Sequence, residues 1–365
     1  MKSYSEFMEY IKENVTDYLP ERFEEAEISI QQVVKNNDVV LDGLSIRNPD
    51  SNISPNIYLN PLYEQYQKGR NLDELVSGIA DTYIENMEPI ENRTFQVQIE
   101  DIKNYEVVKG EIFPRLVNLE KNTTCLQNVP YMQREDLAIT YHVKVSGNRD
   151  SIGSLMITNE LMEVYGVTKE KLHTQAMENM ERLSPPVFLP LGEMIVDVMT
   201  EDFGRNEGVS QEEAKEYVKD MIPTGGPNVY CLTNQYKMNG AVGIMSESIQ
   251  QMVADRVGGD YYVLPSSVHE VLIVPQSAGM DPEELTDMVN TVNEGCVMQD
   301  EILSDHVYQY DAKEHKLSLC APAKEMKQEQ TMEQNRQPAF EEKSIDATKQ
   351  PEQSHEPIKH SGRSH

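Results

Sequence analysis

Two serines and a histidine stand close together in the segment 264–270, Leu-Pro-Ser-Ser-Val-His-Glu. A serine nucleophile needs a base within hydrogen-bond reach and a third group that orients the base. Ser267 and His269 are two residues apart and share one face of an extended segment, while Ser266 and the carboxylate of Asp305 complete the candidate set. No Gly-x-Ser-x-Gly sequence surrounds the serines. A turn capped by serine together with a structural histidine is the simpler interpretation of the same residues.

Cys231 is a second candidate nucleophile, because a nearby imidazolium such as His269 or His306 would lower the pKa of its thiol. A lone cysteine in an apolar strand is more often buried and inert. The same histidines stand beside Asp305 and Glu270, which adds oxygen donors for a metal, but the His-Glu-x-x-His pattern is absent. We therefore expect no metal site.

Two glycine pairs are candidates for phosphate-binding loops, namely Gly225-Gly226 before Pro227 and Gly258-Gly259 before Asp260. Neither matches a Walker or dinucleotide fingerprint, and both suit chain turns and helix ends. The sequence therefore predicts no nucleotide site and no cofactor.

Hydrophobic periodicity predicts the elements that would position the serine segment. It stands at a strand junction, so its side chains would be presented by the ends of two strands. The expected elements of this region are a hairpin of 229–232 with 241–245, a helix from Ser246 to Gly258, strands at 261–264 and 270–274, a helix from Asp281, and a hairpin of 307–310 with 316–319.

The rest of the chain shows the same mixture of helical and strand periods. The N-terminal part predicts an opening helix stopped by Pro20, a hairpin turning at 35–38, a short strand near Ile57 and a helix from Asn71. The middle part predicts strands at 112–119, 137–145 and 154–157, helices from Thr168, over 191–199 and from Ser210, and an exposed connection at 201–208.

These patterns predict an α+β protein, with mixed or antiparallel sheets and packed helices. We expect three α+β units, at residues 1–90, 91–222 and 223–320, followed by a disordered tail at 321–365. The tail has almost no large apolar residues, so it buries too little surface to offset the entropy of an ordered chain.

Acidic residues dominate the charge of the chain, with 62 Asp and Glu against 32 Lys and Arg and a net charge of -30. The tail is nearly neutral, so the charge belongs to residues 1–320. This sign argues against direct binding to nucleic acid or to anionic membranes, which attract Lys and Arg.

The chain contains no apolar run near the roughly 20 residues of a membrane-spanning helix, and its N-terminus has no secretory h-region. Its four cysteines are widely separated and form no CxxC pair, as expected for reduced thiols. We therefore expect a cytoplasmic protein.

Several short strings resemble an uncharacterised bacterial family that is common in gut Firmicutes, the domain-of-unknown-function family 5688. The strings are Val33-Val34-Lys35-Asn36-Asn37, Leu41-Asp42-Gly43-Leu44, 52–59, Leu116-Val117-Asn118, Glu120-Lys121-Asn122, Val129-Pro130, Asp136-Leu137-Ala138 and 264–271. The likeness covers residues 1 to about 319. A second uncharacterised bacterial family is more distantly similar, through Leu62-Tyr63-Glu64-Gln65-Tyr66, Leu72-Asp73-Glu74-Leu75 and the Leu-Pro-Ser-Ser region. The resemblance implies a fold and no established activity.

Three functions compete on this basis. The favoured one is a non-enzymatic binding or interaction protein, whose acidic body selects a basic or neutral protein partner. The alternatives are a hydrolase-like enzyme that uses Ser266, Ser267 and His269, and an acidic mimic of DNA.

Overall fold

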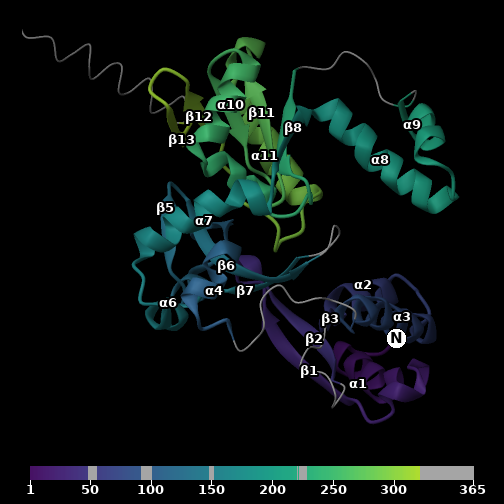
Figure 1. The fold of residues 1–365 in the computed structure, drawn as a ribbon. Helices are drawn as coiled ribbons and strands as arrows, with labels where there is room; N and C mark the ends of the chain where they lie inside the picture. Colours follow the sequence, from purple (N-terminus) through teal and green to yellow (C-terminus); the bar gives the residue numbers. More distant parts are fainter. Residues whose placement is uncertain (48–55, 92–100, 148–151, 220, 222–227, 321–365) are drawn as a thin grey trace, which may run out of the picture. The chain divides into compact units, whose positions relative to one another are not determined.

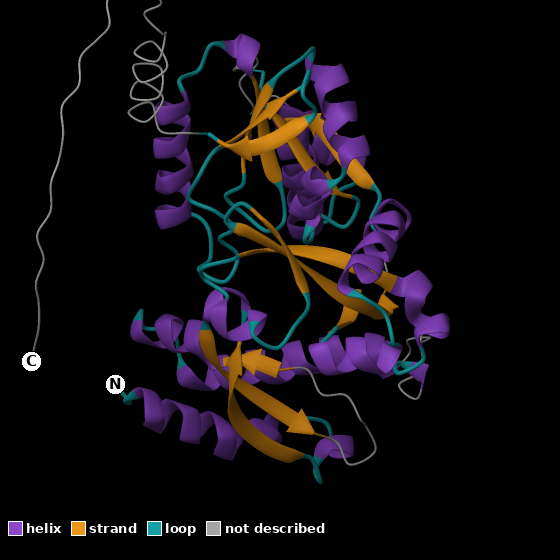
Figure 2. Ribbon diagram, turned by 90° about the vertical axis from the view of Figure 1, so that its left-hand side faces the viewer, coloured by secondary structure: helices purple, strands orange, loops and turns teal. Residues whose placement is uncertain are grey.

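The computed structural model describes residues 1–47, 56–91, 101–147, 152–219, 221 and 228–320. Met1–Cys320 form one compact unit, in which three antiparallel sheets are each packed against helices (Figures 1 and 2). The fold is therefore α+β, as predicted. The predicted tail at 321–365 and the glycine pair Gly225-Gly226 lie outside the described residues.

The first sheet has the strand order β1-β2-β3 and shares a hydrophobic core with helices α1, α2 and α3. The predicted hairpin is confirmed, since β1 and β2 pair up to Val34 and Val40. Asn37 and Asp38 in its turn have φ values of 61° and 51°, a region that Asn and Asp tolerate better than most residues. The elements are α1 Tyr4–Asn14, η1 Val15–Tyr18, η2 Glu21–Phe23, β1 Glu27–Val34, η3 Asn36–Asp38, β2 Val40–Arg47, β3 Asn56–Tyr58, α2 Leu59–Gln67 and α3 Leu72–Glu91.

The second sheet is built around the long strand β6, which pairs with β4 on one side and with β5 and then β7 on the other. Leu116, Ile139 and Tyr141 share one face of it and pack against helix α7. The elements are α4 Tyr105–Val108, η5 Lys109–Glu111, β4 Ile112–Asn118, α5 Thr123–Leu126, β5 Tyr131–Arg134, β6 Leu137–Gly147, β7 Ile152–Met156, α6 Asn159–Tyr165 and α7 Lys169–Leu183.

The third sheet has the order β13-β12-β10-β11-β9-β8 and is covered on both faces. Tyr261 and Val263 pack toward α10, while Leu264 and Val274 pack toward α11. The elements are β8 Pro186–Pro190, α8 Leu191–Glu207, α9 Gln211–Lys219, β9 Tyr230–Asn234, η6 Gly240–Met245, α10 Glu247–Val257, β10 Tyr261–Leu264, β11 Val271–Pro275, η7 Gln276–Ala278, α11 Pro282–Gly295, β12 Tyr308–Asp311 and β13 Lys316–Leu319.

The predicted hairpin of 229–232 with 241–245 is wrong. The second segment is the 3-10 helix η6, and β9 pairs instead with β8 and β11. The cause lies in the turn before η6, where Lys237 and Asn239 take positive φ and Gly240 donates its N–H to the carbonyl of His269 at 2.9 Å. This bond turns the chain away from a strand beside β9.

The predicted exposed connection at 201–208 is also wrong for most of its length, because α8 continues to Glu207. Gly208 then ends the helix with a positive φ of 64°. The division of the chain into units that end at residues 90, 222 and 320 stays a prediction. Strand β8 belongs to the third sheet although it precedes residue 223 in the sequence. No helix among the described residues is long and apolar enough to cross a membrane.

Candidate ligand-binding cavity

A cavity of about 640 Å³ opens where the β1–β2 turn, the second sheet and two loops of the C-terminal region meet. This is within the usual size range of small-molecule sites. Its wall residues come from parts of the chain that are distant in sequence. They include Lys35, Asn36, Arg115, Val117, Asn122, Cys125, Asn128, Thr140, His142, Met156, Asn239, His269, Asp300 and Glu301.

The floor of the cavity is the polar face of the second sheet. Arg115 of β4 stands opposite Thr140 of β6, and Phe113 stands opposite His142. Because side chains alternate along a strand, these residues point away from the face that packs on α7. Thr140 and His142 are nevertheless buried, at 1% and 4% exposure. The sheet is thus covered on both faces, apolar on one and partly polar on the other.

Arg115 is the main charge on this floor. Its Nη2 donates to Ser154 Oγ at 2.9 Å, while the buried Nε has no hydrogen-bond partner among the described residues. No ion pair joins Arg115 to an acid within the described part of the chain, although Asp300 and Glu301 line the same cavity. Burial lowers the pKa of Arg115 to about 10, so the guanidinium still carries its charge at neutral pH.

His142 lies beside this guanidinium as a neutral imidazole. Its Nε2 is 3.3 Å from Thr140 Oγ1, and its ring is 5.7 Å from that of Phe113. Burial, and then the charge of Arg115, hold the pKa of His142 well below its usual value. His142 can accept or donate a hydrogen bond here but adds no positive charge.

His269 lines the opposite wall, and both of its ring nitrogens are engaged. Nδ1 accepts from the backbone N–H of Asn239 at 3.2 Å, and Nε2 lies 3.2 Å from Glu301 Oε1. The amide donor requires an unprotonated Nδ1, so the proton of the neutral ring is on Nε2, facing Glu301. The imidazole is held in place by these two contacts.

The structure does not join the predicted serine and histidine groups as a nucleophile and its base. Ser267 is buried, its Oγ accepts the backbone N–H of His269 at 2.9 Å, and no bond to the imidazole is present among the described contacts. Ser266 lines a different cavity. Asp305 accepts from Lys121 at 3.0 Å and Asn293 at 2.8 Å, away from His269. These four residues hold loops in place.

The other candidates from the sequence are the Cys231 thiol and a metal site. Cys231 is buried in β9, and burial together with the charge of Glu270 raises the pKa of its thiol to about 12. Such a thiol is protonated at neutral pH and is a poor nucleophile. No group of three metal-ligating side chains occurs among the residues that the structure describes.

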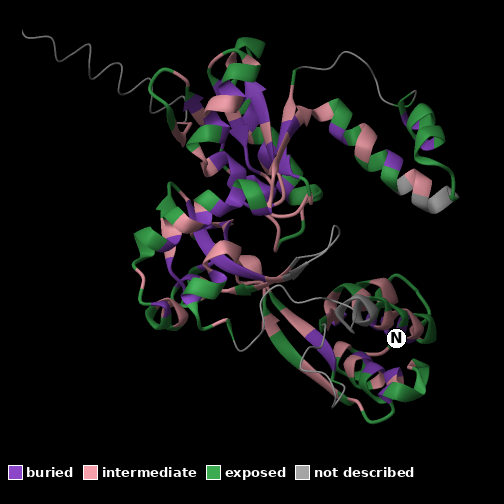
Figure 3. Ribbon diagram, viewed as in Figure 1, coloured by how far each residue is buried: buried purple, intermediate pink, exposed green. Residues whose placement is uncertain are grey.

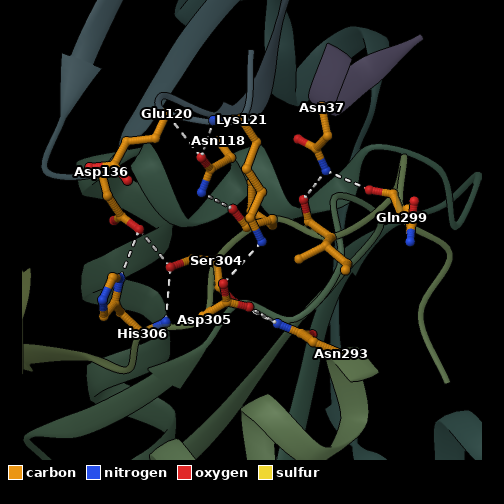
Figure 4. A network of polar contacts seen from close by, with 12 residues as sticks. Asn37, Asn118, Glu120, Lys121, Asp136, Asn293, Gln299, Ser304, Asp305 and His306 are labelled. Atoms are coloured by element: carbon orange, nitrogen blue, oxygen red, sulfur yellow. Dashed lines mark hydrogen bonds and ion pairs between the residues drawn. The ribbon is translucent and has the colours of Figure 1, made fainter. Parts of the chain in front are cut away.

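One wall of the cavity, the segment 298–306, carries Asp300 and Glu301 and is held by side chains of the two preceding sheets (Figure 4). Asn37 Nδ2 donates to the carbonyls of Gln299 and Ile302 at 2.8 and 2.7 Å. Asn118 Nδ2 donates to the carbonyl of Leu303 at 2.9 Å. The turn of the first hairpin thereby reaches directly to this wall.

The far end of the same segment is fixed by carboxylates (Figure 4). Asp136 accepts from Ser304 Oγ at 2.7 Å, contacts His306 Nδ1 at 3.1 Å and accepts the hydroxyl of Tyr308. Burial alone would raise the pKa of Asp305, but the bonds from Asn293 and Lys121 outweigh it and leave that pKa below its usual value. The segment is thus anchored at both ends.

Sequence reasoning missed Arg115, Thr140 and His142. The available signal was the alternation in β6, where polar residues at 140, 142 and 144 interrupt the apolar ones at 139, 141 and 143. Such a pattern normally indicates a face open to water. Only the neighbouring loops, which the pattern does not reveal, convert that face into a cavity floor.

Comparison with protein families matches residues 4–312 to one family model, described as Family of unknown function (DUF5688). No curated protein and no solved structure matches the chain.

Proposed function

The chain belongs to this family of unknown function. We propose that it is a non-enzymatic protein that binds a small anionic ligand in the 640 Å³ cavity. The ligand carries a carboxylate or phosphate group that pairs with Arg115. This proposal refines the expectation of a binding protein and replaces a macromolecular partner with a small molecule.

The observation that carries the proposal is the uncompensated guanidinium. The chain has 62 acidic residues, yet none of those described forms an ion pair with Arg115. Arg115 is half-buried, and holding an unpaired charge partly away from water is unfavourable, so a ligand that supplies the opposite charge would relieve that cost. The planar guanidinium suits carboxylate and phosphate oxygens, which it binds with paired hydrogen bonds.

Asn36 supports a ligand with more than one polar group. Its Nδ2 donates to the carbonyl of Asp300 at 2.8 Å, while its buried Oδ1 has no partner among the described residues. A hydroxyl or amino group on the ligand would satisfy that acceptor. The cavity wall therefore offers the Nε donor of Arg115 and the Oδ1 acceptor of Asn36, neither of which bonds to another described residue.

A purely binding role is supported by the state of the possible catalysts. His269 has both nitrogens engaged, and His142 is neutral and buried beside a cation. A general base works best when its pKa lies near the operating pH, so the lowered pKa of His142 makes it a weak base. The hydrolase and the DNA mimic stay predictions of the sequence, and no described contact favours either.

The test is isothermal titration of the purified protein with inorganic phosphate, glutarate and the neutral analogue glutaramide. We expect the anions to bind and glutaramide not to bind. Arg115→Gln should weaken anion binding about ten- to hundredfold, because a hydrogen bond to a charged group contributes about 1.5–3 kcal/mol.

The matched control is Arg134→Gln, which removes an exposed arginine from β5 of the same sheet. It should leave anion affinity unchanged. Equal affinity of the wild type and Arg115→Gln, or no anion binding at millimolar concentrations, would contradict the proposal.

A further inference from the structure

A second cavity, of about 390 Å³, lies on the other side of the serine segment, between the start of α8 and the end of α11. Its walls are mostly apolar and include Met194 and Val198 of α8, Leu272 of β11 and Val292 of α11. Figure 3 shows that α8 is exposed or half-buried along most of its described length, while Met194 in the cavity wall is buried.

One carboxylate stands in these apolar walls. Glu270 is half-buried, and among the described residues no ion pair joins it to a cation. Burial raises the pKa of Glu270, and the nearby Ser267 and His269 only partly oppose this effect. The one lysine that lines the cavity, Lys237, is already paired with Glu201 at 3.1 Å.

We propose that this cavity binds a small apolar primary amine, with its ammonium group on Glu270 and its hydrocarbon chain against Met194, Val198 and Leu272. The proposal is independent of the anion site. It assigns the two cavities ligands of opposite charge.

An amine fits these surroundings better than the other ligand classes. A fatty acid would place its carboxylate against Glu270, in a chain whose net charge is already -30. A neutral hydrocarbon would leave the half-buried carboxylate of Glu270 unpaired, which is unfavourable. Cys231 and Thr233 at the same end of the cavity are uncharged, so Glu270 is the group that selects the ligand's charge.

The size of the site favours a small molecule over a protein segment. A volume of 390 Å³ is near the lower end of the range for small-molecule pockets. The exposed apolar residues Ile195 and Met199 continue along α8 outside the cavity walls. Self-association through that helix is therefore a separate outcome, which analytical ultracentrifugation of the same samples would reveal.

The experiment compares hexylamine, hexanol and hexanoate as ligands of the full-length protein by isothermal titration. We expect hexylamine to bind at least about tenfold more tightly than hexanol, and hexanoate to bind least. Glu270→Gln, which keeps the size and hydrogen-bonding capacity of the side chain, should remove the preference for the amine. Glu294→Gln, at an exposed position of α11 that lines neither of these two cavities, is the matched control and should leave the preference intact.

Two further measurements separate loss of binding from loss of folding. Val198→Trp fills the cavity from a 40% exposed position, and it should abolish hexylamine binding while the melting temperature stays near that of the wild type. Amine affinity should also fall as the pH is lowered through the raised pKa of Glu270, because protonation removes the partner charge. Equal binding of hexanol and hexylamine, an unchanged Glu270→Gln variant, or loss of the preference in Glu294→Gln would overturn the inference.

Discussion

Arg115 shows how a single side chain can be unfavourable for folding and useful for binding. Its aliphatic stem lies in the second sheet, and its guanidinium lies over the ring of Phe113 at 5.5 Å. Packing and the bond to Ser154 offset part of the cost of burying the charge. The remaining cost is present in the ligand-free protein and is relieved when an anion binds.

This reasoning predicts that Arg115→Met stabilises the ligand-free protein. The methionine keeps an apolar stem of similar length and removes the half-buried, unpaired charge, so the free energy of unfolding should rise by about 1 kcal/mol. Urea denaturation without added anions measures it, with Arg134→Met as an exposed control expected to change little. A marked loss of stability in Arg115→Met would show that the charge is compensated in the folded protein.

The turn between β9 and η6 begins the segment whose structure the sequence pattern predicted wrongly. The apolar run 241–245 has the composition of a strand, but every residue in it except Met245 is buried in a 3-10 helix. Gly240 permits this arrangement because its backbone lies against β9 and the His269 carbonyl. The same turn places the Asn239 amide on His269, so it contributes to one wall of the larger cavity.

Gly240→Ala should therefore be strongly destabilising. An added Cβ would lie 2.5 Å from Thr233 Oγ1, 2.6 Å from Asn234 N and 2.8 Å from His269 O, and two of these atoms belong to the backbone. We expect a loss of about 1–3 kcal/mol in unfolding free energy. Gly243→Ala is the matched control, since its Cβ would meet Ile249 Cδ1 at an ordinary 3.6 Å. Equal stability of the two variants would refute the close-packing argument.

Most individual elements could be predicted because their signals are local. The first hairpin, strand β6 and the hairpin β12–β13 follow from alternation and turn residues within one short stretch. The cavity could not be predicted, because its walls come from positions as far apart as Asn36 and Glu301. The serine segment drew attention by its residue types, while the unpaired guanidinium is recognisable only once its surroundings are known.

Across the compact unit, the segment 298–306 connects the three sheets. Asn37 reaches it from the first hairpin, Asn118 and Asp136 reach it from the second sheet, and it leads directly into β12 of the third. The side chain of Asn37 makes two of these bonds. Its backbone N–H also donates to Asn122 Oδ1, and its Oδ1 accepts from Asn122 Nδ2. The cavity wall thus depends on the first hairpin.

Asn37→Gly tests this dependence. Glycine tolerates the positive φ of 61°, so the variant removes the side-chain bonds without straining the turn. Backbone amides of 299–304 should exchange hydrogen faster, and anion affinity should fall, because about 1 kcal/mol is lost with each bond. The control is Asn71→Ala, which removes an exposed helix cap far from the segment in sequence. Unchanged exchange at 299–304 would contradict the role of Asn37.

His269 and Glu270 are neighbours in the chain, yet one lines the larger cavity and the other the smaller. The two sites therefore share a single stretch of backbone between Ser267 and Val271. Thermodynamic linkage is reciprocal, so any factor by which an anion alters the affinity for an amine must equal the factor by which the amine alters the affinity for the anion. A titration of one ligand at several fixed concentrations of the other therefore measures the coupling free energy between the two sites.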